Sequence, residues 1–134
     1  MGNKPIRVLL AKTGLDDRNR EIRSLARGLK DEYGMEIIYT GLYRSLEEIV
    51  ETALQENVDV VGLGVSNGRE MEIFPRLREL LDARDAKAII LIGGGVIPPM
   101  HRTSLKESGS VTEIYGLGSS VKTIAESLMQ IVIP

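Results

Sequence analysis

The sequence contains no cysteine and no tryptophan, and it has only one histidine and one phenylalanine. Without cysteine, the chain can form neither a disulfide nor a thiolate metal site, and it has no cysteine nucleophile. The single histidine, His101, excludes a zinc site built from several imidazoles. So few aromatic side chains also give little material for stacking nucleic-acid bases.

Strong net charge and long apolar runs are absent as well. The formal net charge of −2 gives no electrostatic reason to expect nucleic acid or an anionic membrane as a partner. No apolar run approaches the roughly 20 residues that span a bilayer. The 134 residues, 43% apolar and 27% charged, fit one ordinary globular domain over residues 1–134. We therefore expect a single cytoplasmic domain.

Short apolar runs alternate with segments of helical periodicity. Five runs are rich in Val and Ile, which is typical of strands that are buried on both faces of a parallel sheet. They are Ile6–Ala11, Met35–Thr40, Val58–Leu63, Ala88–Ile92 and Thr112–Tyr115. Between them, apolar residues recur with the spacing of one helix face. These helical stripes begin at Ile22, Leu46, Ile73 and Val121.

Local signals mark several helix ends. Ser45 and Glu48 have the spacing of a capping box, and Gly34 suits the C-terminal stop of the first helix. Pro98 and Pro99 can open a helix, which predicts a short fourth helix from about Met100. With right-handed crossovers, this order predicts an α/β fold. It is a doubly wound five-stranded parallel sheet of flavodoxin-like order 2-1-3-4-5, with helices on both faces.

Ligands of such sheets bind beyond the carboxyl ends of the strands. The predicted loops there are Lys12–Arg18, Gly41–Arg44, Gly64–Glu70, Gly93–Pro99 and Gly116–Ser120, and each of the five carries at least one glycine. The three successive glycines Gly93–Gly95 would remove every side chain from part of the crevice. Gly116–Ser120 offers a turn, a hydroxyl cap and a helix N-terminus that could receive an anion. Neither glycine cluster fits the P-loop or the dinucleotide fingerprint.

Six segments carry a resemblance to a known family. They are Ala11–Asp16, Tyr39–Leu42, Glu47–Leu54, Phe74–Arg76, Gly93–Pro98 and Gly116–Ser120. Over nearly the whole chain, and with the spacing preserved, they resemble the cobalamin-binding domain or small subunit of methylmalonyl-CoA mutase-like enzymes. The resemblance implies cobalamin as the cofactor. It also implies a larger mutase-type catalytic subunit as partner, or self-association, in an isomerase.

The first motif of that family departs from its pattern here. The motif reads Asp-x-His-x-x-Gly, and its histidine is the lower cobalt ligand. In this chain Asp16 matches, Arg18 stands at the histidine and Glu21 at the glycine. A guanidinium has no lone pair to offer, so Arg18 cannot ligate cobalt. Asp16 could then pair with Arg18 or Arg20, or cap the first helix.

Of the other two motifs of that family, the second is lost in this chain and the third is kept. The Ser-x-Leu motif, which lines the slot for the displaced benzimidazole tail, falls on Gly64, Val65 and Ser66 and matches at neither defining position. The glycine pair is intact at Gly93 and Gly94. The resemblance thus implies cofactor-binding residues but no metal ligand. The residues are Asp16, Arg18, Gly64, Ser66, Gly93, Gly94, Gly95, Gly116, Gly118 and Ser119.

Two hypotheses about function stay open. The chain is either a cobalamin-binding subunit without a histidine ligand, or a diverged relative that binds no cobalamin and serves as an interaction or regulatory subunit. The sequence has neither a nucleophile elbow nor a cluster of metal ligands, so we do not expect the chain to catalyse a reaction alone. A response-regulator receiver would need an aspartate at the end of the third strand, where Gly64 and Val65 stand. We interpret His101 as a surface residue rather than a replacement metal ligand or acid–base group.

Overall fold

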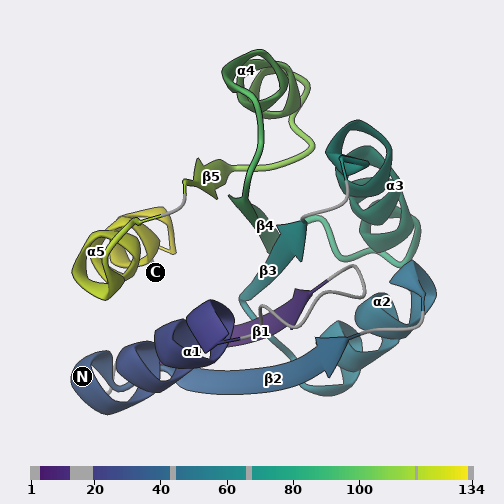
Figure 1. Cartoon of the computed structure of the whole chain (residues 1–134). Helices are drawn as coiled ribbons and strands as arrows, with labels where there is room; N and C mark the ends of the chain where they lie inside the picture. Colours follow the sequence, from purple (N-terminus) through teal and green to yellow (C-terminus); the bar gives the residue numbers. More distant parts are fainter. Residues whose placement is uncertain (1–3, 13–19, 43–44, 66–67, 117, 133–134) are drawn as a thin grey trace.

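Strands and helices alternate along the chain in the computed structural model, which describes residues 4–12, 20–42, 45–65, 68–116 and 118–132 (Figure 1). The strands are β1 (Arg7–Lys12), β2 (Glu36–Leu42), β3 (Val60–Val65), β4 (Ile90–Gly95) and β5 (Glu113–Tyr115). The helices are α1 (Arg20–Tyr33), α2 (Leu46–Gln55), α3 (Glu70–Ala83), α4 (Pro99–Glu107) and α5 (Val121–Ile131). All strand pairings are parallel, and the order β2-β1-β3-β4-β5 confirms the predicted topology.

The helices cover both faces of the sheet. Successive strand residues point to opposite faces, so β1 sends Leu9 and Ala11 to one side and Val8 and Leu10 to the other. The first pair packs in a core with residues of α2, α3 and α4. The second pair packs with residues of α1 and α5. Within the part of the chain that is described, no helix has the length and apolarity to cross a membrane.

The predicted helix ends are confirmed where the structure describes them. The Ser45 hydroxyl accepts a hydrogen bond from the backbone N–H of Glu48 at 3.1 Å, which caps α2. Gly34 follows α1 with a φ of +68°, a conformation that favours glycine. The proline pair opens α4 at Pro99, one residue before the predicted start. At α5, the Ser120 hydroxyl accepts from the backbone N–H of Thr123 at 3.1 Å.

The strand ends differ from the prediction. β3 and β4 end at Val65 and Gly95, two and three residues beyond the predicted ends. Gly64 and Gly93–Gly95 therefore lie inside strands and not in the loops, where we expected them. In the ladder, Leu63, Gly64 and Val65 pair with the three glycines in turn. The apolar pattern stops early because glycine has no side chain to signal burial, although its backbone continues the sheet.

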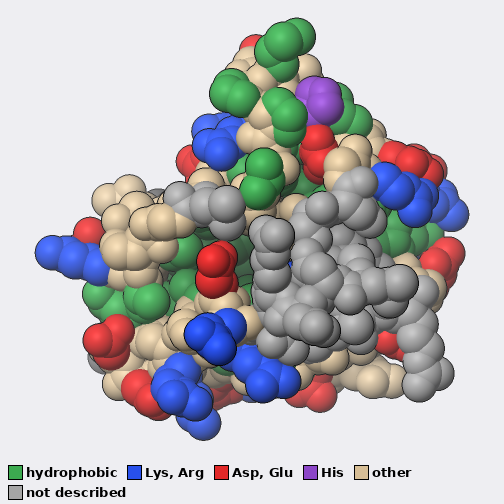
Figure 2. All heavy atoms as spheres, in the orientation of Figure 1, with side chains coloured by type: hydrophobic (Ala, Val, Ile, Leu, Met, Phe, Trp, Pro, Cys, Tyr) green, Lys and Arg blue, Asp and Glu red, His purple; other side chains and the backbone are tan. Residues whose placement is uncertain are grey.

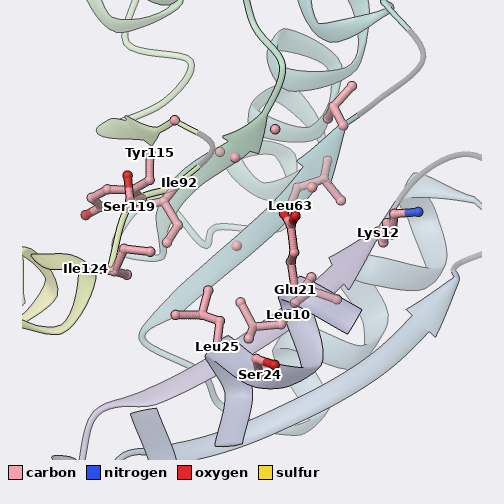
Figure 3. A pocket seen from close by; sticks show the side chains of 18 of the residues that line it. Leu10, Lys12, Glu21, Ser24, Leu25, Leu63, Ile92, Tyr115, Ser119 and Ile124 are labelled. Atoms are coloured by element: carbon pink, nitrogen blue, oxygen red, sulfur yellow. The ribbon is translucent and has the colours of Figure 1, made fainter. Parts of the chain in front are cut away.

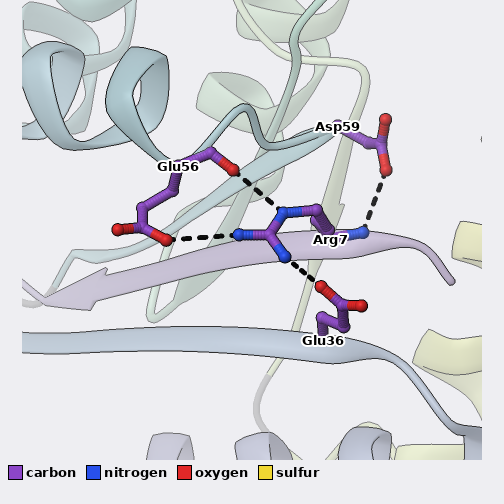
Figure 4. Close-up of polar contacts among 4 residues, drawn as sticks. All are labelled: Arg7, Glu36, Glu56 and Asp59. Carbon is purple, nitrogen blue, oxygen red and sulfur yellow. Dashed lines mark hydrogen bonds and ion pairs between the residues drawn. The ribbon is translucent and has the colours of Figure 1, made fainter.

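At the end of the sheet where the strands begin, Arg7 connects β1 to three neighbouring segments (Figure 4). Its Nε donates to the carbonyl oxygen of Glu56 at 2.9 Å, and its Nη2 donates to the Glu56 carboxylate at 3.2 Å. Nη1 pairs with the Glu36 carboxylate, and the backbone N–H of Arg7 donates to Asp59 Oδ2 at 2.9 Å. The start of β1 is thereby tied to β2, to the end of α2 and to the residue before β3.

We expect Arg7→Ala to lower the free energy of unfolding by about 1 to 2 kcal/mol, because the carbonyl and carboxylate oxygens lose their donors. The value stays modest because the guanidinium is 32% exposed and its carboxylate partners are about half exposed. Urea unfolding monitored by circular dichroism measures the change. Arg27→Ala, at an exposed position of α1, is the control and should change stability by less than about 0.5 kcal/mol. Equal effects of the two substitutions would show that the Arg7 contacts contribute nothing.

Candidate functional site

A cavity of about 590 Å³ opens between α1 and α5, over the carboxyl halves of β1, β3 and β4 (Figure 3). Its walls are mainly apolar and include Leu10, Leu25, Ile92 and Ile124. In the strand order, β1 and β3 form the point at which the chain changes direction across the sheet. Open α/β sheets bind ligands at such a point. The cavity is therefore the candidate site.

Two glycines leave the floor of the cavity bare. A Cβ added at Gly94 would meet only the Tyr115 carbonyl oxygen, at 3.6 Å. A Cβ at Gly64 would meet nothing closer than Lys12 Cγ at 3.8 Å. These are ordinary contact distances, so packing within the protein does not require glycine at either position. The room above them is open to a ligand.

The glycines beside Gly94 have other roles. A Cβ at Gly93 would lie 2.6 Å from Phe74 Cζ, on the opposite face of the sheet. Gly95 has a φ of +115°, and its Cβ would lie 2.3 Å from the Val65 carbonyl oxygen. All three line the cavity, but we had expected all three to clear the crevice of side chains. Only at Gly94 does the missing side chain enlarge the cavity, because neighbouring strand residues face opposite sides.

The width of the cavity depends on how closely α1 and α5 approach each other. Just beyond the cavity, Gly28 of α1 faces Val121 of α5. A Cβ at Gly28 would lie 2.8 Å from Val121 Cγ1, closer than side-chain atoms pack. Gly28 itself does not line the cavity. The absence of a side chain at position 28 thus sets the distance between the two helices.

Polar groups lie along the walls. Lys12, 7% exposed, ends β1, and Glu21 and Ser24 come from α1. The Tyr115 hydroxyl lies 2.6 Å from Ser127 Oγ. Burial raises the pKa of the Tyr115 hydroxyl; the hydrogen bond with Ser127 acts in the opposite direction, and the Glu113 carboxylate adds to the rise. Tyr115 is therefore a neutral group at physiological pH.

The loop before α5 contributes the fourth side of the cavity. Gly118, with a φ of +86°, and Ser119 both line the cavity. The backbone N–H of Ser119 donates to the Gly116 carbonyl oxygen at 3.2 Å. Gly116 leaves room for Arg102, because a Cβ there would lie 3.1 Å from Arg102 Nη2. A backbone hydrogen bond therefore closes the turn, and the missing side chain at Gly116 lets the Arg102 guanidinium of α4 approach it.

The structure brings together seven of the ten residues predicted to bind a cofactor. Gly64, Gly93, Gly94, Gly95, Gly116, Gly118 and Ser119 all line this one cavity. The other three, Asp16, Arg18 and Ser66, lie outside the described residues. Among the residues described, no group of three or more His, Cys, Asp or Glu side chains could hold a metal ion.

One polar pair was missed by sequence reasoning. His101 Nδ1 lies 2.6 Å from Glu70 Oε2, where the N-termini of α3 and α4 meet. Glu70 is buried, whereas the His101 side chain is 41% exposed. This exposure agrees with our interpretation of His101 as a surface residue, but the sequence did not indicate that Glu70 is its partner. Figure 2 shows hydrophobic side chains around the histidine over α4. The two residues are 31 positions apart, so no local pattern could have paired them.

Comparisons with known proteins agree with this geometry. Residues 6–125 match the family model described as B12 binding domain. The chain is 42% identical to the 2-hydroxyisobutanoyl-CoA mutase small subunit of Aquincola tertiaricarbonis, over 98% of this chain and 96% of that one. It is 34% identical to the pivalyl-CoA mutase small subunit of Xanthobacter autotrophicus, over 93% and 82% of the two chains.

Among solved structures, a cobalamin-binding protein from Desulfitobacterium hafniense has the same fold. The superposition has a TM-score of 0.78 with 16% sequence identity, and it covers 97% of this chain and 60% of that chain. At this identity the likeness shows the fold alone.

Proposed function

Because this chain belongs to the B12-binding domain family, we propose that it binds cobalamin and acts as the small subunit beside a separate, larger acyl-CoA mutase subunit. The relatives named above are small subunits, and this chain matches one of them over almost its full length. The observation that carries the proposal is the cavity between α1 and α5, whose floor is bare at Gly64 and Gly94.

The residues present fit a large planar ligand with a displaced tail. The apolar walls at Leu25 and Ile92 suit the benzimidazole of the cobalamin tail, and the bare floor at Gly94 allows its close approach. When bound, cobalamin supplies the radical chemistry of such rearrangements. This chain holds and orients the cofactor and excludes water from its tail, and the larger subunit holds the CoA substrate.

The lower face of cobalt is where this chain departs from the family. Arg18 replaces the ligating histidine and has no lone pair to offer. His101 pairs with Glu70 and does not line the cavity. We therefore propose that this chain would hold the tail in the cavity and would offer no imidazole to cobalt, so that water would be the ligand available to the metal.

Titration with hydroxocobalamin, methylcobalamin and adenosylcobalamin, followed by gel filtration, tests the proposal. We expect stoichiometric retention of cobalt and a visible spectrum with the benzimidazole detached and no imidazole bound. Arg18→His should shift this spectrum to that of histidine ligation, because an imidazole nitrogen then has a lone pair for cobalt. His101→Gln is the control and should leave the wild-type spectrum unchanged.

Three results would contradict parts of the proposal. Loss of all cobalt on gel filtration would refute cobalamin binding. A wild-type spectrum with the benzimidazole still on cobalt would refute the placement of the tail in the cavity. A spectrum that changes in His101→Gln would identify that histidine as the ligand and refute the water-ligated state.

A second function, an interaction or regulatory subunit without a cofactor, is favoured by one sequence observation. Both the ligating histidine and the Ser-x-Leu motif are replaced, at Arg18 and at Gly64 and Ser66. The exposed apolar side chains of Val96, directly after β4, and Met100, in the first turn of α4, would suit such a contact. Retention of cobalt in the titration above decides against this function.

A further inference from the structure

A carboxylate stands in the wall of an otherwise mainly apolar cavity. Glu21, in the first turn of α1, lines the cavity, and in Figure 3 its side chain extends from α1 toward the strands near Leu63. Its position corresponds to the glycine of the motif that the chain resembles, so Glu21 departs from that motif. Among the described residues, Glu21 has no hydrogen-bond or ion-pair partner.

Glu21 is an exposed residue at the cavity wall, so water can reach and hydrate its carboxylate. A ligand that fills the cavity displaces this water. The carboxylate then loses its hydration, which is unfavourable unless the ligand donates a hydrogen bond in return. An apolar group or a second acceptor beside Glu21 is therefore disfavoured, and an N–H or O–H donor is favoured.

Other lining groups agree with a partly polar ligand surface at this wall. Ser24 lies one helical turn after Glu21 and lines the cavity from the same face of α1. Its hydroxyl can donate as well as accept. Leu25 and Ile22, also on this face, keep the remaining wall apolar. The wall thus suits a flat ring that carries one polar edge.

We infer that Glu21 selects the nucleotide tail of the bound corrinoid, favouring an adenine base over dimethylbenzimidazole. This inference rests on the proposed function. Once it is joined to ribose, dimethylbenzimidazole keeps no N–H donor, whereas the exocyclic amine of adenine has two. Hydroxyls of the ribose are present in both tails, so they cannot discriminate between the two corrinoids.

The test compares two corrinoids that differ only in the tail base, adenine or dimethylbenzimidazole. Dissociation constants are measured by visible-spectrum titration of the full chain. We expect the wild type to bind the adenine corrinoid about tenfold to a hundredfold more tightly, the range of one hydrogen bond to a charged group. In Glu21→Ala the preference should disappear, mainly because the benzimidazole corrinoid binds better.

Two further variants sharpen the comparison. Glu21→Gln keeps the size and an acceptor but removes the charge, so its preference should be intermediate. Glu32→Ala removes an exposed carboxylate of the same helix outside the cavity, and its preference should equal that of the wild type. Urea unfolding of each variant confirms that the fold is intact.

The failures are distinguishable. Equal affinities in the wild type, or a preference that survives Glu21→Ala, would overturn the inference and leave cobalamin binding intact. Equal weakening of both corrinoids by Glu21→Ala would place the contact on the ribose and also overturn selection of the base. If neither corrinoid binds to the wild type, the proposed function fails.

Discussion

Replacement of Gly94 with leucine is expected to reduce cobalamin affinity at least about a hundredfold while the free energy of unfolding stays within about 1 kcal/mol of the wild type. The added Cβ meets only the Tyr115 carbonyl oxygen at 3.6 Å, so the strand accepts the side chain. The rest of the leucine occupies the cavity that the cofactor tail needs. Cobalt retained after gel filtration and urea unfolding measure the two effects separately.

Gly94→Ala provides the graded control. One added carbon removes less room than a leucine, so affinity should fall by a smaller factor than in Gly94→Leu. If the leucine variant binds cobalamin like the wild type, the tail does not lie over Gly94. If instead it unfolds, the glycine is required by packing, and our account of the cavity floor is wrong.

Gly93→Ala, one residue earlier, should have the opposite profile. We expect it to lower the free energy of unfolding by about 1 to 3 kcal/mol, because the new Cβ would lie 2.6 Å from Phe74 Cζ in a filled core. Phe74 is fully buried, so its ring cannot move aside without disturbing its neighbours. Cobalamin affinity of the folded protein should be unchanged. Chemical denaturation and titration give the two values.

A double-mutant cycle isolates the contact. Phe74→Leu alone should be destabilising, but in the Gly93→Ala background the smaller side chain relieves the overlap. We expect the two substitutions to couple favourably by about 1 kcal/mol. Strictly additive effects would show that the cost of Gly93→Ala arises elsewhere than at Phe74.

The order of elements could be predicted because strands of a parallel sheet appear as continuous apolar runs. The continuous run from Val58 to Leu63 was confirmed as strand β3. Helices appear instead as periodic stripes, and the stripe beginning at Ile73 was confirmed as α3. The carboxyl ends of β3 and β4 could not be predicted from this pattern. Gly64 and Gly93–Gly95 continue the ladder through backbone hydrogen bonds, which leave no trace in hydropathy.

Seven of the ten residues that the resemblance implies for a cofactor site line one cavity, but what each of them does there could not be predicted. Family resemblance gathered the glycines of β4 and of the loop before α5, and the structure places them around one cavity. Which glycine faces the cavity depends on the strand register, since Gly93 and Gly94 point to opposite faces. The pairing of Glu70 with His101 depends on the meeting of two helix ends, which only the topology brings about.

Because of the contact between Gly28 and Val121, the width of the cavity can change while the residues that line it stay the same. A side chain at position 28 must either displace the Val121 side chain or push α1 and α5 apart, because its Cβ would overlap the Val121 methyl groups. Position 28 lies outside the lining, whereas Val121 is part of it, so such a change alters the width of the cavity at Val121 without substituting any lining residue. During divergence, the chain could therefore admit bulkier ligands by substitution at one site and keep its inherited contacts intact.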